Sequence, residues 1–123
     1  MKKNKGILFW ITGLSGSGKT TIAEKIKKNI SNRFGPTLTV SGDELRKIFD
    51  YKNFSTKDRL IYALSYGKFC KCITDKNINV IFSTVSLFNQ VRKWNRSNIE
   101  NYIEIYIESD IKELIKKKTK IFL

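Results

Sequence analysis

The chain has 123 residues, of which 41% are hydrophobic, and a formal net charge of +13 at neutral pH. This length predicts a single domain over residues 1–123 with one core. No apolar run approaches the roughly 18 residues of a membrane-spanning helix, and the first strand begins too early for a secretory signal peptide. We therefore expect a cytoplasmic protein that makes no membrane contact.

The positive charge has two interpretations: a nucleic-acid-binding surface, or a general abundance of lysine. The lysines are scattered over predicted helices and are not gathered beside aromatic residues. A nucleic-acid-binding surface usually concentrates its charge in a patch or stripe. Binding of nucleic acid is therefore not expected, although the charge favours small anionic nucleotides in either case.

The sequence contains two cysteines, Cys70 and Cys72, and no histidine. Two thiolates without further ligands cannot complete a tetrahedral zinc site, and residues two apart on a helix do not face each other. We expect both thiols to be reduced and either packed in the core or partly exposed, with no disulfide.

An apolar run over residues 7–12 predicts a buried parallel strand, and a glycine-rich stretch follows it directly. That stretch is Gly13-Leu14-Ser15-Gly16-Ser17-Gly18-Lys19-Thr20-Thr21. It matches the Walker A pattern of a P-loop, and a predicted helix over 19–30 comes next, as the motif requires. The glycines allow backbone amides to surround phosphate oxygens, and the helix N-terminus adds its dipole.

Within this loop, Lys19 is expected to reach the β and γ phosphates of ATP, and the Thr20 hydroxyl to ligate Mg²⁺. The alternative is a simple glycine turn with a solvated lysine. The strand before the loop and the helix after it both favour nucleotide binding instead. The sequence therefore predicts an ATP and Mg²⁺ site over residues 13–21.

The rest of the chain alternates between strand and helix patterns. Strands are predicted over 37–40, 77–85 and 102–107, and helices over 43–49, 55–74, 87–95 and from 109 onward. The long helix is expected to contribute Leu60, Ile61, Leu64 and Ile73 to the core. This alternation predicts an α/β protein with the three-layer α/β/α P-loop NTPase fold and a mostly parallel sheet. Asp43 and Ser86 follow predicted strands, so both should join the P-loop at the carboxyl edge of the sheet.

Four segments together resemble adenylylsulfate (APS) kinases. They are the P-loop with its continuation Ile22-Ala23, Ser41-Gly42-Asp43-Glu44-Leu45-Arg46, Phe54-Ser55 with Asp58-Arg59, and Thr84-Val85-Ser86. They occur in the order of that family, between residue 7 and about residue 110. The resemblance implies transfer of the γ-phosphoryl group of ATP to the 3′-hydroxyl of adenylylsulfate, giving phosphoadenylylsulfate and ADP in sulfate assimilation.

The resemblance also implies roles for individual residues. Lys19 and Asp43 would be catalytic, with Asp43 holding the 3′-hydroxyl, taking its proton and contacting Mg²⁺ alongside Thr20. The implied substrate-binding residues are Asp43, Arg46, Phe54, Arg59, Val85 and Ser86. From the residues alone other roles stay open: Asp43 or Ser86 as a helix cap, Arg46 and Arg59 as solvated surface, and Phe54 as core.

The sequence also departs from the family. Ser41 replaces its first acid, Tyr62 stands where an asparagine is frequent, and Ser86-Leu87-Phe88 replaces Ser-Pro-Tyr. This variant is similar to APS-kinase-like proteins that accompany surface-polysaccharide genes. A related 3′-hydroxyl kinase for another activated nucleotide, such as cytidine diphosphoramidate, is therefore the alternative function.

The family continues with a basic lid and a fifth strand, and residues 117–123 do not match them. A lid excludes water from the transferred phosphoryl group. Without it we expect ATP binding to survive better than turnover, which keeps an inactive ATP-binding fragment as a further alternative. A second chain, for example in a homodimer, is the other possible source of the missing parts.

Overall fold

The computed structural model describes residues 5–14, 16, 18–86 and 88–108. Its elements are β1 (Ile7–Gly13), α1 (Lys19–Phe34), β2 (Thr37–Ser41), α2 (Gly42–Ile48), α3 (Thr56–Thr74), β3 (Asn79–Thr84), α4 (Asn89–Asn98) and β4 (Asn101–Ile107). The helix predicted from residue 109 lies outside the described residues. None of the helices in the described part is both long enough and apolar enough to span a membrane.

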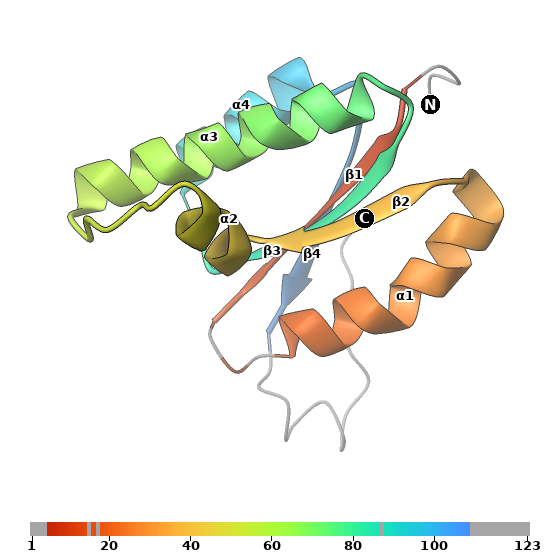
Figure 1. The fold of residues 1–123 in the computed structure, drawn as a ribbon, viewed down its shortest axis with the longest axis horizontal. Helices are drawn as coiled ribbons and strands as arrows, with labels where there is room; N and C mark the ends of the chain where they lie inside the picture. Colours follow the sequence, from red (N-terminus) through yellow and green to blue (C-terminus); the bar gives the residue numbers. More distant parts are fainter. Residues whose placement is uncertain (1–4, 15, 17, 87, 109–123) are drawn as a thin grey trace.

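The strands form a parallel sheet in the order β2-β3-β1-β4. Helix α1 covers one face, whereas α3 and α4 cover the other, and α2 lies at the end of β2 (Figure 1). Parallel strands buried on both faces read as nearly continuous apolar runs, which explains why β1 and β3 were recognisable from sequence. The predicted three-layer α/β/α fold is confirmed.

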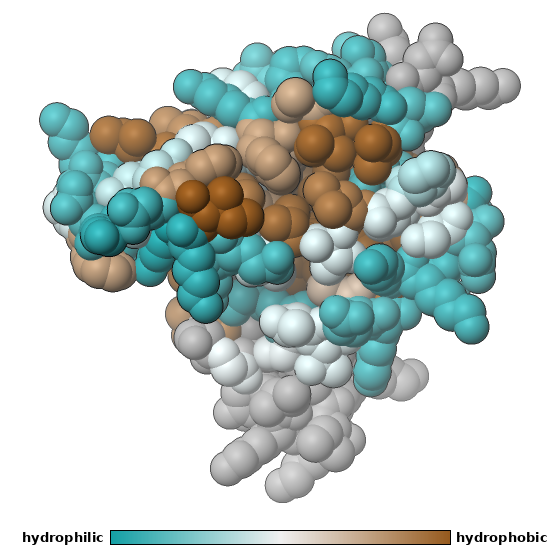
Figure 2. All heavy atoms as spheres, viewed as in Figure 1, coloured by the Kyte–Doolittle hydropathy of each residue, from teal (hydrophilic) through white to brown (hydrophobic). Residues whose placement is uncertain are grey.

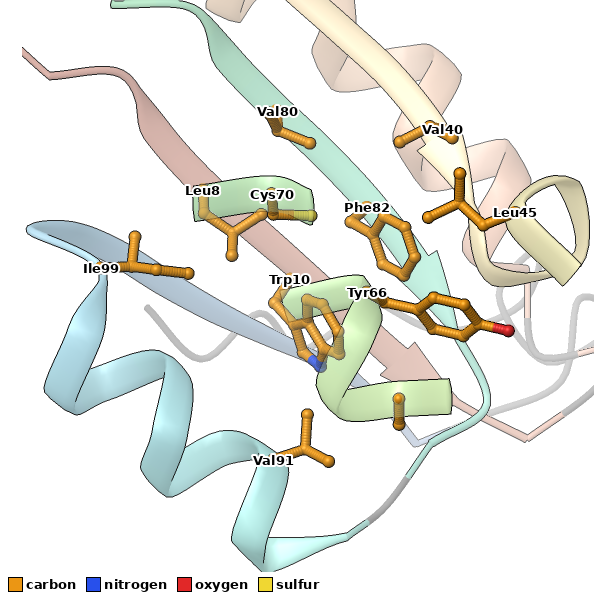
Figure 3. Packing of buried hydrophobic residues seen from close by; sticks show 11 residues of the cluster. Leu8, Trp10, Val40, Leu45, Tyr66, Cys70, Val80, Phe82, Val91 and Ile99 are labelled. Carbon is orange, nitrogen blue, oxygen red and sulfur yellow. The ribbon is translucent and has the colours of Figure 1, made fainter. Parts of the chain in front are cut away.

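Alternate residues of the central strands contribute to separate cores on the two faces of the sheet. Towards α3 and α4, Trp10 stacks on Phe82 with ring centroids 4.9 Å apart, and Tyr66 packs beside them (Figure 3). Towards α1, Ile11 and Ile22 are buried in the second cluster. In the space-filling view, hydrophilic residues surround a band of apolar ones between α3 and β2 (Figure 2).

Helix α1 is longer than predicted, because it continues from the expected end at residue 30 to Phe34. Gly35 ends the helix with φ 96°, a left-handed value that glycine adopts without strain, and Pro36 follows. Nothing in residues 31–34 breaks the helix before that point. The glycine, rather than the polar residues ahead of it, is therefore the stop signal.

The start of α2 corrects the suggestion that Asp43 caps this helix. Ser41 is the N-cap, and its hydroxyl accepts a hydrogen bond from the Glu44 amide at 3.1 Å. Asp43 lies in the first turn with its side chain exposed. It is therefore free for another role at the edge of the sheet.

Helix α4 spans Asn89–Asn98, so it begins and ends later than the predicted 87–95. Phe88 is still extended, with ψ 123°, which delays the start of the helix. At the other end Ile99 is buried and extended, and it leads directly into β4.

Helix α3 has the predicted cap, because Ser55 accepts a hydrogen bond from the Asp58 amide at 3.2 Å. The prediction of its core face was partly wrong. Leu60, Leu64 and Ile73 pack against the core, but Ile61 is 51% exposed. The fully buried positions are Ala63, Tyr66, Gly67, Cys70 and Thr74. Most of these residues are small or carry a polar atom, so apolar spacing alone did not reveal them.

The two cysteines should differ in reactivity. Cys70 is fully buried, and this burial raises the pKa of its thiol, whereas Cys72 is exposed. Because the thiolate is the reactive form, we expect a disulfide reagent at pH 8 to modify one thiol per folded chain quickly and two after denaturation. Cys72→Ser should abolish the fast reaction. Equal rates for both thiols in the folded chain would contradict the placement of α3.

Candidate active site

The glycine-rich loop connects the end of β1 to the start of α1. Gly16 and Gly18 have φ values of 81° and 98°, a region in which other residues are strained. Gly18 is the N-cap of α1 and, being a glycine, offers no capping side chain, and the first turn contains no acidic residue. The amides at this helix start are therefore available for an anion. Ser15 and Ser17 of the predicted site lie outside the described residues.

Lys19 is folded back along this loop. Its ammonium group donates hydrogen bonds to the carbonyl oxygens of Gly13 at 3.0 Å and Leu14 at 2.9 Å. Burial lowers the pKa of Lys19, and the nearby Asp43 carboxylate partly opposes this effect. These carbonyls hold the cation beside the cavity in which phosphates are expected.

A first cavity of about 330 Å³ lies between the loop, the start of α2 and the end of β3. Its lining includes most of the predicted nucleotide site, namely Gly16, Gly18, Lys19, Thr20 and Thr21, together with Asp43. Gly13 and Leu14 do not line it, but they anchor Lys19.

Thr20 and Asp43 both line this cavity, and their hydroxyl and carboxylate oxygens are of the kind that Mg²⁺ prefers. Among the described residues, no group of three or more His, Cys, Asp or Glu side chains is placed to hold a metal ion. Magnesium commonly takes only one or two protein ligands and completes its shell with substrate phosphates and water. The residues present therefore fit Mg²⁺ bound together with a nucleotide.

A second cavity of about 340 Å³ adjoins the first. It contains most of the predicted acceptor site, because Arg46, Arg59, Val85 and Ser86 all line it. Arg46 and Val85 also line the first cavity, so they form part of a shared wall. One cavity thus offers loop amides and a lysine, and the other offers two guanidinium groups.

Phe54 does not line either cavity. Its ring is 66% exposed, which excludes the alternative that it belongs to the core. The guanidinium carbon of Arg46 lies 5.1 Å from the centre of this ring, within the range of a cation–π contact. Arg46 is also not a solvated surface arginine, because its Nε is buried and has no hydrogen-bond partner among the described residues. Arg59 is exposed at the mouth of the second cavity.

The shared wall contains two residues that the sequence analysis missed, Tyr66 and Thr84. Helical spacing could have found the first, since Tyr66 lies one turn beyond Tyr62 and two turns beyond Arg59 on α3. Gly42 brings both close to α2: a Cβ at this glycine would lie 3.1 Å from the Thr84 hydroxyl and 3.3 Å from the Tyr66 ring.

Replacement of Lys19 should weaken MgATP binding without destabilising the fold. In Lys19→Ala the affinity for MgATP should fall at least tenfold, because a hydrogen bond to a charged group contributes about 1.5–3 kcal/mol. The melting temperature should stay nearly unchanged, since the hydrogen bonds of Lys19 within the described residues go to loop carbonyls rather than to the core. Titration calorimetry measures the first quantity and thermal unfolding the second. Lys25→Ala, at an exposed position of the same helix, is the control. Equal MgATP affinity in both variants would contradict the assignment.

The chain is similar in sequence to known kinases. The family model for adenylylsulphate kinase matches residues 5–122. The cytidine diphosphoramidate kinase of Campylobacter jejuni is 39% identical over 118 residues, which cover 96% of this chain and 69% of that protein. The adenylyl-sulfate kinase of Gloeothece citriformis is 28% identical over 110 residues, and the match covers 89% of this chain and 62% of the relative. The chain thus spans about two thirds of the length of these relatives.

The fold is also shared with a solved structure, the APS kinase of Mycobacterium tuberculosis in complex with AMPPNP and APS. The TM-score is 0.77 at 22% identity, and the match covers 91% of this chain and 68% of that one. This likeness supports the fold, whereas the family model covers nearly the whole sequence. The chain therefore belongs to the adenylylsulphate kinase family.

Proposed function

We propose that this chain uses MgATP to phosphorylate the 3′-hydroxyl of a small activated nucleotide. The observation that carries the proposal is the position of Asp43. It lines one cavity with Lys19 and Thr20, and that cavity shares a wall with a second one containing Arg46 and Arg59. A carboxylate between a phosphate-binding loop and a cationic pocket suits a kinase that brings two anionic nucleotides together.

On the ATP side, the amides at the start of α1 would bind phosphate oxygens. Lys19 would exchange its bonds to the Gly13 and Leu14 carbonyls for bonds to the β and γ phosphates. Thr20 and Asp43 would hold Mg²⁺, which neutralises charge that develops on the transferred group. Without nucleotide, the Lys19 ammonium group bonds neutral carbonyl oxygens. Charged phosphate oxygens would replace them, because they form stronger hydrogen bonds with a cation.

On the acceptor side, Arg46 and Arg59 would bind the phosphoryl groups of the second nucleotide. Asp43 would orient the 3′-hydroxyl and accept its proton as the oxygen–phosphorus bond forms. Phosphoryl transfer has a loose transition state, so orientation of this hydroxyl matters more than strong basicity. Phe54 would supply a face for the base of the acceptor. Its exposure leaves the ring accessible, and its contact with Arg46 links the base to the phosphoryl group.

Two acceptors are the main candidates. Adenylylsulfate follows from the family, and it would place the chain in sulfate assimilation. Cytidine diphosphoramidate is favoured by the higher identity to the Campylobacter jejuni enzyme, 39% against 28% for the adenylyl-sulfate kinase of Gloeothece citriformis. The Ser86–Phe88 segment, which departs from the sulfate-assimilation pattern, borders the acceptor cavity through both of these residues. We therefore rank cytidine diphosphoramidate first, with a cytoplasmic location and a homodimer as further predictions.

Release of ADP from MgATP tests the proposal directly. We expect cytidine diphosphoramidate to stimulate ADP release more than adenylylsulfate does, relative to a reaction without acceptor. The Lys19→Ala variant should show no stimulation by either compound. ATP binding without stimulation by either acceptor would contradict the proposed activity and favour an ATP-binding fragment.

Asp43→Asn keeps the shape of the side chain but removes its charge and basicity. We expect kcat to fall about 10²- to 10⁴-fold, the usual contribution of a positioned general base. The KM for ATP should change far less, because the loop and Lys19 provide most of the phosphate contacts. Glu44→Gln is the matched control, since Glu44 adjoins Asp43 on α2 but does not line either cavity. Similar kcat values for the two variants would exclude Asp43 as the base.

A further inference from the structure

Tyr66 is an unusual residue to find in the wall between two cavities. Its side chain is 5% exposed, and its ring packs on Phe82 at a centroid distance of 5.5 Å. The Arg46 guanidinium lies beside the hydroxyl but can only donate, so the hydroxyl proton has no acceptor among the described residues. Figure 3 shows this hydroxyl at the end of the ring that points away from the core cluster, on the side where β1 and β3 end.

A buried hydroxyl without a partner is costly. Buried side-chain polar atoms are nearly always bonded, and an unpaired one loses its bond to water without replacement. A phenylalanine would pack equally well at a position that only filled the core. Because Tyr66 lines both cavities, its hydroxyl is placed to donate to a ligand there.

The neighbouring groups indicate what kind of ligand this is. Arg46 lines both cavities with Tyr66, and its Nε is likewise buried without a partner. Both groups are donors, and burial raises the pKa of the Tyr66 hydroxyl, an effect that a hydrogen bond and the charge of the adjacent Arg46 guanidinium only partly oppose. The phenol therefore stays protonated at neutral pH. Two adjacent donors that include a guanidinium group suit a phosphoryl oxygen.

We propose that Tyr66 is a substrate-positioning residue, and that its hydroxyl and the Nε of Arg46 bind one phosphoryl oxygen of the acceptor nucleotide. The ligand belongs to the acceptor, because the Tyr66 helix also contributes Arg59, Tyr62 and Ala63 to the second cavity. The phosphates of ATP are already provided for by the loop and Lys19. A phosphoryl group fixed at the shared wall would direct the attached ribose towards Asp43. This inference rests on the proposed kinase function and adds a residue to its acceptor site.

Tyr66→Phe removes only the hydroxyl and tests this assignment. We expect the Kd of the acceptor, measured by titration calorimetry in the presence of a non-hydrolysable ATP analogue, to rise about tenfold or more. The Kd of the ATP analogue itself should be unchanged. In the assay of ADP release, the KM for the acceptor should rise more than kcat falls. Thermal unfolding should show a folded protein, because the ring that packs on Phe82 is retained.

Tyr51→Phe is the matched control. Tyr51 belongs to the same aromatic cluster, but its hydroxyl is bonded to the Ser65 hydroxyl at 3.3 Å and it does not line either cavity. This variant should bind the acceptor as the unmodified chain does. Arg46→Lys keeps the charge but removes Nε. Because both donors serve one oxygen, its effect and that of Tyr66→Phe should not be additive in the double variant.

The outcomes distinguish a wrong assignment of Tyr66 from a wrong proposed function. If the unmodified chain binds the acceptor and Tyr66→Phe binds it equally well, the assignment of Tyr66 is wrong while the proposed function stands. Additive effects of Tyr66→Phe and Arg46→Lys would show that the two groups bind different atoms, which also overturns the assignment. If the unmodified chain binds ATP but neither candidate acceptor, the proposed function fails together with the inference.

Discussion

The parallel register of β1, β2 and β3 is the constraint on which the site depends. Thr12 pairs with Thr84 across β1 and β3, and Ser41 pairs with Ser83 across β2 and β3. All three strands consequently end at the same level. The segments that follow them are the glycine loop, the start of α2 and residues 85–86, so they must meet at one edge. A slip of one register position would turn alternate side chains to the wrong face and separate these segments.

The polar groups that cap the helices and join the strands are bonded, whereas several at the acceptor cavity, like Trp10 Nε1 and Asn95 Oδ1 elsewhere in the fold, are buried without partners among the described residues. Ser41 and Ser55 are bonded as helix caps, and Asn79 bonds the Ile7 amide and the Phe34 carbonyl. In contrast Arg46 Nε, the Tyr66 hydroxyl and the Ser86 hydroxyl are buried without partners in the described structure, and all three residues line the second cavity. Binding sites commonly retain groups that are unfavourable for the free protein, because the ligand satisfies them.

The sequence predicted the structure best at positions where local backbone geometry or burial restricts the residue type. The P-loop glycines, the Ser55 cap and the apolar strands could be recognised because each follows from backbone geometry or from burial on both faces. The positions of Asp43, Arg46 and Arg59 at adjoining cavities also agree with expectation. Their roles in catalysis and binding remain predictions.

The features that sequence reasoning missed depend on contacts between distant segments. The sequence around Tyr66 is that of a core position on a helix, and its place in the cavity wall becomes visible only when Arg46 from α2 and Thr84 from β3 line the same cavity. Ile61 shows the converse error, because its apolar side chain faces solvent while the smaller Ala63 and Gly67 are buried. The close contact between α3 and α4 is the reason, because a Cβ at Gly67 would collide with the side chain of Asn95 on α4. The buried face of α3 therefore requires small residues there instead of large apolar ones.

The cations of the site are held in fixed orientations, whereas the net charge of the whole molecule is not directed at any one position. The net charge of +13 attracts any anion, and this attraction weakens with salt and carries no geometric information. Lys19 and Arg46 are instead half-buried, and each is aligned by a neighbour: two loop carbonyls for Lys19 and the Phe54 ring for Arg46. Alignment before binding reduces the entropy lost when a phosphate arrives. Oriented cations of this kind can discriminate between nucleotides by geometry, whereas the surrounding lysines can raise only the rate of encounter.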